Sequence, residues 1–210
     1  MLQKPGSIID ISVGISADTP VYTDDAPFRL TRHADFSRGD GFMLSSFSMT
    51  LHCGTHMDAP LHFVDGASPI DAVPPDKWVL PATVVDMTHA EAITADLLAG
   101  TKLSSDEAVL FKTGSGYPAR RPGKPVTLTP DGAECLLKQG IALAGIDGLS
   151  IESDDDPGFP VHHILLGAGV LILEMIDLSN VEPGSYTLVA APLKLERAEA
   201  SPVRAFLIQS

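Results

Sequence analysis

The segment from His52 to His62, with the sequence His-Cys-Gly-Thr-His-Met-Asp-Ala-Pro-Leu-His, holds three of the seven histidines of the chain together with an aspartate. Imidazole and carboxylate groups together suit zinc, manganese or iron, because each offers a directional lone pair and a carboxylate can bridge two ions. Gly54 and Pro60 argue against one continuous helix, so a tight loop is expected here. The segment predicts a catalytic metal centre, and the fold must bring these side chains to one point.

Apolar and polar positions alternate along the residues that precede this segment. The alternation over residues 46–52 has the period of two that is typical of a strand with one apolar face, and it places His52 at the end of the polar face. We expect the following loop to fold back toward His52. Such a loop would present His56, Asp58 and His62 to the same point.

A second unusual feature lies more than one hundred residues later. Glu174 interrupts the apolar run over residues 169–178, which otherwise predicts a buried strand. Burial of an unpaired carboxylate costs on the order of several kcal/mol, so Glu174 either has a partner such as a metal ion or faces water on an edge strand. Upstream, His162 and His163 are adjacent, and a period of two would let only one of them face a given side.

These features together resemble the metal-dependent cyclase family, and in particular its bacterial kynurenine formamidases. The resemblance is carried by the string His-x-Gly-Thr-His-x-Asp-x-Pro-x-His, by His162 followed by His-Ile-Leu-Leu, by Glu174 twelve positions later, and by the tail segments Pro192-Leu-Lys-Leu and Ala200-Ser-Pro-Val-Arg-Ala. It extends from Ile9 to Phe206. The resemblance implies an α/β fold of the swivelling β/β/α type, rich in strands with few helices, and a homodimer or homotetramer.

The resemblance also implies roles for individual residues. Two divalent ions, zinc or alternatively manganese, would be held by His52, His56, Asp58, His162 and Glu174. Asp58 would bridge the two ions, and Glu174 would touch both. His62 would be the catalytic proton donor and acceptor, a role that suits a side chain whose ordinary pKa lies near physiological pH. Ligation of metal by His62 is the competing role.

Such a site supports metal-assisted amide hydrolysis, because paired divalent ions lower the pKa of a shared water and stabilise the oxyanion. The predicted reaction is hydrolysis of N-formyl-L-kynurenine to L-kynurenine and formate. One alternative is another cyclase-family reaction, the opening of a lactone or of a cyclic amide such as isatin. An alternative from another class is a metal-stabilised binding protein with a closed site, although mixed ligands and a spare His62 favour an open site.

Two segments depart from the formamidase pattern and bear on the substrate. Where the family commonly has Pro-Val-Trp-Pro-Gly-Asp, with a tryptophan that stacks on the substrate, this chain has Tyr22 within Pro-Val-Tyr-Thr-Asp-Asp. Tyr22 can also stack on a substrate and adds a hydroxyl, while an ordinary half-buried aromatic is the alternative. Residues 112–121 also differ from the corresponding formamidase segment.

Composition limits the remaining possibilities. A chain of 210 residues, 44% of them hydrophobic, predicts one domain over residues 1–210. A formal charge of −13 argues against nucleic acid as a partner and leaves a small-molecule substrate. The first residues lack an apolar signal segment, and no run approaches the roughly 18 apolar residues of a membrane helix, so we expect a cytoplasmic protein that does not enter a membrane.

Regular elements are predicted along the whole chain. A helix should begin near Thr129, which can cap it ahead of Pro130, and end at Gly140. A shorter helix is predicted over residues 94–99. Strands are predicted over residues 7–13, 44–52, 82–87, 108–112, 142–146, 170–176, 186–190 and 205–208.

Overall fold

The computed structural model describes residues 6–117 and 123–209. In these ranges the chain forms three α-helices, namely α1 (Ala95–Ala99), α2 (Pro130–Gln139) and α3 (Pro160–Gly167). It also forms ten strands, namely β1 (Ile8–Asp10), β2 (Arg29–Ala34), β3 (Leu44–Ser48), β4 (His56–Asp58), β5 (Val79–Asp86), β6 (Ala108–Lys112), β7 (Leu143–Ile146), β8 (Leu171–Glu174), β9 (Gly184–Pro192) and β10 (Ala200–Ile208). The short 3₁₀ turns are η1 (Phe36–Arg38), η2 (Pro60–His62), η3 (Ile70–Ala72) and η4 (Pro75–Lys77).

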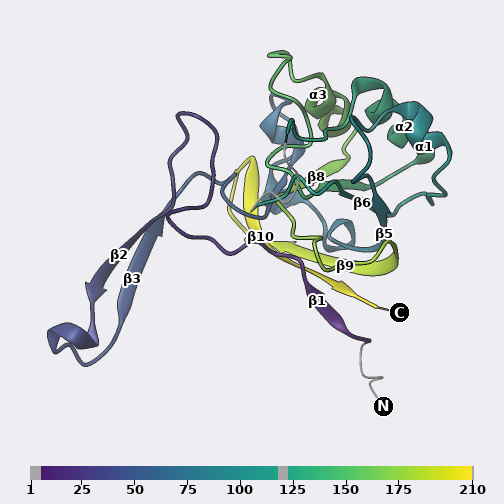
Figure 1. Ribbon diagram of the computed structural model, residues 1–210. Helices are drawn as coiled ribbons and strands as arrows, with labels where there is room; N and C mark the ends of the chain where they lie inside the picture. The colour runs from purple at the N-terminus through teal and green to yellow at the C-terminus, as the bar shows by residue number, and fades with distance from the viewer. Residues whose placement is uncertain (1–5, 118–122, 210) are drawn as a thin grey trace.

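Seven of the strands close into a barrel. Their order is β10-β4-β8-β7-β6-β5-β9, and β9 pairs back onto β10, while β1 adds to β10 from outside the ring. Strands β5, β6, β7 and β8 are parallel neighbours, so each needs a crossover to the next, and α1, α2 and α3 lie in these crossovers. The helices gather on one side of the barrel (Figure 1). The predicted strand-rich α/β class is confirmed.

The core has two parts, which the two faces of the strands separate. Side chains that point into the barrel, such as Leu110 and Leu173, form one buried cluster. Their sequence neighbours, such as Phe111 and Ile172, pack in a second cluster with side chains of the helices. Strands buried on both faces need continuous apolar sequences, and β6 to β8 have them.

Most predicted elements are present, with shifted ends. Helices α1 and α2 follow Thr94 and Thr129, whose hydroxyls accept backbone N–H bonds at the helix starts, and Gly140 ends α2 with φ of 76°. The strand over 108–112 has the predicted bounds. Strand β2 and helix α3 were not predicted, and residues 56–58 form a strand where the sequence predicted a loop.

The prediction of a strand over residues 44–52 is wrong in where the strand ends and in what surrounds it. It ends at Ser48, and it pairs only with β2 in a separate two-stranded sheet. This hairpin extends away from the barrel (Figure 1), so its apolar side chains do not enter the core. Only the first part of the alternating pattern, up to Ser48, forms a strand, and this strand is not part of the barrel.

Among the described residues, no helix combines the length and the apolar character needed to cross a membrane.

Candidate metal centre

Strands β4 and β8 place the central residues of the site on the outer face of the barrel. Met57 and Leu173 point inward to the barrel cluster. Because side chains alternate along a strand, His56, Asp58 and Glu174 point outward, toward the side that α3 covers. His56 lies directly opposite Glu174 in the antiparallel pair of β4 and β8. Far-separated parts of the sequence thus meet through strand pairing.

The turn before β4 explains the Gly-Thr pair in the string. Gly54 has φ of 72°, and a Cβ at this position would lie 2.7 Å from Cγ1 of Ile15, so only glycine fits without strain. The hydroxyl of Thr55 donates to the carbonyl of Met175 at 2.5 Å and accepts from the Val13 N–H at 2.8 Å. Thr55 thus fastens the start of β4 to the residue after Glu174.

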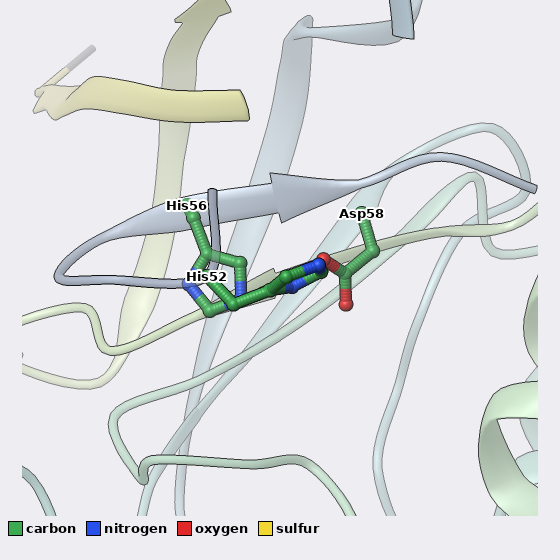
Figure 2. A group of neighbouring side chains, drawn as sticks. All are labelled: His52, His56 and Asp58. Carbon is green, nitrogen blue, oxygen red and sulfur yellow. The ribbon is translucent and has the colours of Figure 1, made fainter. Parts of the chain in front are cut away.

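His52, His56 and Asp58 form the first group of converging ligand atoms. His52 lies in the turn after β3, and its Nδ1 is 3.0 Å from Oδ1 of Asp58. His56 Nε2 is 3.5 Å from the same oxygen. The side chains of this group point toward one another (Figure 2). One ligand atom from each of the three residues lies within 4.8 Å of the others, a spacing that one ion could span.

Asp58, His162 and Glu174 form a second group with the same spacing. The Glu174 carboxylate lies between two imidazoles, with Oε2 at 3.3 Å from His56 Nε2 and Oε1 at 3.5 Å from His162 Nε2. Oε1 also accepts the Ile151 N–H at 2.7 Å. The structure therefore brings together all five residues predicted as ligands, and Asp58 belongs to both groups.

The buried atoms of this cluster fit a cation. His56 Nδ1 lies 2.9 Å from the Gly54 carbonyl, a bond in which the ring donates, so the lone pair of Nε2 faces the cluster. Among the described residues, His56 Nε2 and both carboxylate oxygens of Asp58 are buried and make no hydrogen bond of normal geometry, although His52 Nδ1 lies 3.0 Å from Oδ1. Buried polar atoms are almost always paired. These three atoms belong to the two groups of converging ligand atoms. A divalent ion would satisfy them.

The carboxylates of the cluster control the charge of its imidazoles. Burial alone would lower the pKa of His56 and of His162, but the carboxylates outweigh burial and raise these pKa values to about 9 and about 10. Burial alone would raise the pKa of Glu174, but hydrogen bonds from the two imidazoles hold it below its ordinary value. The cluster thus favours positive charge at its centre, which protons or metal ions can supply.

Glu152 is a residue of the site that the sequence interpretation missed. Its carboxylate accepts the N–H groups of Val161 and His162 at the start of α3, at 2.8 and 3.2 Å. It also lies 2.8 Å from His162 Nδ1, which leaves Nε2 facing Glu174. Glu152 is buried, with 5% of its surface exposed. Its position in an acidic surface-like segment gave no sequence signal for this contact.

The structure decides two points that the sequence left open. His162 and His163 lie on helix α3 and not on an extended segment, because Pro160 starts the helix and Glu152 accepts its first N–H groups. His162 is still buried and His163 exposed, since neighbouring helix positions also face different sides. Glu174 does not lie on an edge strand, because β8 pairs with both β4 and β7.

An open cavity of about 220 Å³ lies over the cluster. Histidines, aromatic side chains and carboxylates line it: Tyr22, Asp25, His52, His56, His62, Phe63, Ser150, Phe159, His162 and Glu174. His62, at the end of η2, stacks on the ring of His52 with centroids 4.2 Å apart. Burial lowers the pKa of His62, in contrast to His56 and His162. His62 is therefore beside the cluster but outside both groups of converging atoms.

Tyr22 lies at the rim of this cavity and is half-buried. Its hydroxyl donates to Asp154 at 3.1 Å, and burial raises its pKa, so the phenol stays protonated. Tyr22 and Ser150 also line an adjoining cavity of about 210 Å³. Of the divergent segment 112–121, residues 118–121 lie outside the described part of the chain, and Gly114 donates its N–H to the buried Asp147.

Comparisons with known proteins agree with this fold and site. The family model described as putative cyclase matches residues 9–153. The chain is 37% identical over 205 residues to a kynurenine formamidase of Salinibacter ruber, covering 96% of this chain and 97% of that protein. It is also 33% identical to a kynurenine formamidase of Bacillus cereus. That match covers 97% of this chain and 98% of the other protein.

Solved structures share the whole fold. A predicted metal-dependent hydrolase from Bacillus stearothermophilus is 33% identical, with a TM-score of 0.85 over 97% of this chain and 98% of that one. Isatin hydrolase A from Labrenzia aggregata is 24% identical, with a TM-score of 0.87 over 96% of this chain and 93% of that one. This second likeness shows a shared fold alone. The fold and the cluster define a metal-dependent hydrolase. The chain belongs to the cyclase family.

Proposed function

We propose that this chain hydrolyses N-formyl-L-kynurenine to L-kynurenine and formate at a site that holds two divalent metal ions. The observation that carries the metal site is the pair of ligand groups that share Asp58, whose buried oxygens make no normal hydrogen bond within the described part of the chain. The substrate is supported by relatives that are named kynurenine formamidases and that match nearly the whole chain. Cleavage of a C–N bond is the chemistry that these names describe.

The five clustered side chains would hold the ions, zinc in the first place. Asp58 would contact both ions, because its carboxylate belongs to both groups of ligand atoms. Bound divalent ions lower the pKa of water and stabilise developing negative charge on a carbonyl oxygen. Glu152 would hold His162 in the tautomer whose Nε2 is free, which is a common role for a carboxylate behind a ligating histidine.

His62 would move the proton. Its imidazole lines the cavity and belongs to neither ligand group, so its nitrogens are available to the substrate. As attack on the formyl carbon proceeds, the departing aromatic amine needs a proton, and His62 would donate it. A lowered pKa suits this exchange, because a neutral imidazole first accepts the proton that it later gives.

The aromatic side chains would hold the anilide ring of the substrate. Phe63 and Phe159 line the cavity with their ring centroids 5.6 Å apart, and Tyr22 lines it as well. Phe63 stacks on His162 at 4.6 Å, so its ring is fixed next to the cluster. Aromatic pairs of this kind prefer offset or edge contacts, which a planar anilide can make.

An assay of metal-loaded protein tests the proposal. N-Formyl-L-kynurenine should be turned over faster than isatin, simple lactones and other amides, and His62→Ala protein prepared in parallel should turn it over far more slowly than the native chain. Clear turnover of isatin or a lactone without turnover of N-formyl-L-kynurenine would assign the chain another substrate. Full metal loading without turnover of any of these compounds would contradict the hydrolytic role.

A further inference from the structure

A second cavity, of about 210 Å³, adjoins the cavity over the metal centre. Tyr22 and Ser150 line both cavities, so the two spaces meet at these side chains. Glu152 also connects them, because it lines the second cavity while its carboxylate lies 2.8 Å from Nδ1 of His162 in the metal cluster. A molecule that is bound over the cluster and is too long for the first cavity would therefore enter the second.

The lining of the second cavity carries both signs of charge. Lys124 supplies a formal charge of +1, and the carboxylates of Glu152, Asp154 and Asp155 supply −3, which leaves −2. A site with separate positive and negative groups suits a zwitterion, because each charge of the ligand meets its opposite. An uncharged ligand would gain nothing from these groups.

Asp154 lies at the boundary between the two cavities. The Tyr22 hydroxyl donates to its Oδ1 at 3.1 Å, so this carboxylate is held next to a side chain that lines both spaces. An ionised carboxylate can accept several hydrogen bonds, and the contact with Tyr22 leaves acceptor positions for an ammonium group. Asp154 is exposed, so a ligand can reach it.

Lys124 can turn from its present partner to a ligand. It pairs with Asp155, but the two side chains are 68% and 71% exposed. Exposed ion pairs contribute little to stability, so exchange of this partner costs little. The Ser153 hydroxyl donates to Asp155 at 2.9 Å, so Asp155 keeps a hydrogen bond when the lysine binds another carboxylate.

We propose that the second cavity binds the amino-acid end of the substrate, with Asp154 contacting its ammonium group and Lys124 its carboxylate. This inference rests on the proposed function, since N-formyl-L-kynurenine carries a zwitterionic side chain ortho to its formamide. With the formyl group at the cluster and the ring beside Phe63, this side chain would pass Tyr22 and Ser150. Isatin has no such side chain, so the second cavity would discriminate between the two compounds.

Steady-state kinetics with two formamides tests the proposal. Ortho-acetylformanilide keeps the formamide, the ring and the ketone of N-formyl-L-kynurenine but lacks the amino-acid end. Asp154→Asn can still accept from Tyr22, and it should raise KM for N-formyl-L-kynurenine by about three- to tenfold while leaving KM for ortho-acetylformanilide unchanged. Lys124→Gln should act in the same way. Both effects should shrink as the salt concentration rises, because salt screens exposed charges.

A third compound separates the two roles. The analogue of N-formyl-L-kynurenine in which hydrogen replaces the ammonium group should respond to Lys124→Gln and not to Asp154→Asn. Lys138→Gln and Asp65→Asn are the matched controls, because Lys138 is an exposed lysine in an ion pair, Asp65 is an exposed aspartate, and neither lines the two cavities. Both controls should keep native KM values.

A native KM for N-formyl-L-kynurenine in the Asp154→Asn or the Lys124→Gln protein would overturn the proposal. An equal rise of KM for both formamides would overturn it as well, because the change would then lie at the ring and not at the amino-acid end. Turnover of neither formamide by the native chain would contradict the proposed function instead. Calorimetry with L-kynurenine then decides on the second cavity: weaker binding to the two variants than to the native chain supports it, and equal or absent binding overturns it.

Discussion

His56 and Glu174 are direct partners across the antiparallel pair of β4 and β8, with Nε2 of the histidine 3.3 Å from Oε2 of the glutamate. The centre is therefore built by strand register. A slip of one residue would turn either side chain into the barrel interior, where Met57 and Leu173 now pack. Thr55 ties the two strands together beside this pair and opposes such a slip.

Asp58 belongs to both ligand groups, whereas His52 belongs to one. Metal analysis of the purified native protein should find close to two divalent ions per chain. Asp58→Ala should lose both ions, because each group loses an oxygen ligand. His52→Ala should keep the ion shared by Asp58, His162 and Glu174. Inductively coupled plasma mass spectrometry after dialysis measures the content.

Asp65→Ala is the control for these variants, because Asp65 is exposed and belongs to neither group. It should keep the native metal content. Retention of both ions by Asp58→Ala would contradict the shared role of this carboxylate, and loss of both ions by His52→Ala would contradict the separate second group.

The short-range features of the site were predictable from the sequence. The density of histidines between His52 and His62 identified the cluster, and the cap at Thr129 identified helix α2. The grouping of His162 and Glu174 with that cluster rested on family resemblance, because only the pairing of β4 with β8 and the packing of α3 bring them together.

Other features depend on contacts that no local pattern encodes. The alternation before His52 predicted a strand but gave no sign that this strand lies in a hairpin outside the barrel. Glu152 contacts His162 across ten positions of sequence, through a helix whose start was not recognised. Such contacts follow from tertiary packing, which propensity and periodicity do not report.

His62 should be needed for turnover and dispensable for metal binding. His62→Ala should lower kcat by about 10² to 10⁴, which is the usual contribution of a general acid or base. His163→Ala is the matched control, since His163 is the exposed neighbour of a predicted ligand, and it should stay near native activity. Loss of metal from His62→Ala protein would instead make His62 a ligand.

Glu152 should act on metal affinity through His162. Glu152→Gln keeps an oxygen for the helix N–H groups but removes the charge next to His162 Nδ1. We expect metal affinity to fall by about 10- to 100-fold, as for other carboxylates behind ligating histidines. Competition with a chelator measures the affinity, and excess metal should restore turnover.

Glu134→Gln is the control for this change, because Glu134 is exposed on α2 and pairs only with Lys138 among the described residues. It should bind metal as the native chain does. Native metal affinity in a folded Glu152→Gln protein would show that the carboxylate does not position His162.

Asp147 should give the protein a distinct pH dependence of stability. Burial raises its pKa, although hydrogen bonds from Thr113 and Gly114 oppose the rise. The folded protein then binds this proton more tightly than the unfolded chain, so the stability linked to it is present at acid pH and is lost as the pH rises through the folded-state pKa. Asp147→Asn does not titrate. The unfolding free energy of the native chain relative to this variant should therefore fall as the pH rises above the ordinary pKa of an aspartate.

Urea unfolding at several pH values checks this difference, and Asp65→Asn serves as the exposed control. A difference between native and Asp147→Asn proteins that stays constant with pH, or that grows as the pH rises, would contradict the assignment.

Tyr22 should contribute to substrate binding through its ring more than through its hydroxyl. The hydroxyl donates to Asp154, while the ring lines the cavity with Phe63 and Phe159. Tyr22→Phe keeps the ring and should leave KM near the native value. Tyr22→Ala should raise KM for N-formyl-L-kynurenine by about two- to tenfold, the range expected for one aromatic contact. Tyr117→Ala is the control, because Tyr117 does not line this cavity. Equal KM values for the Ala and Phe variants, both well above the native value, would assign the effect to the hydroxyl.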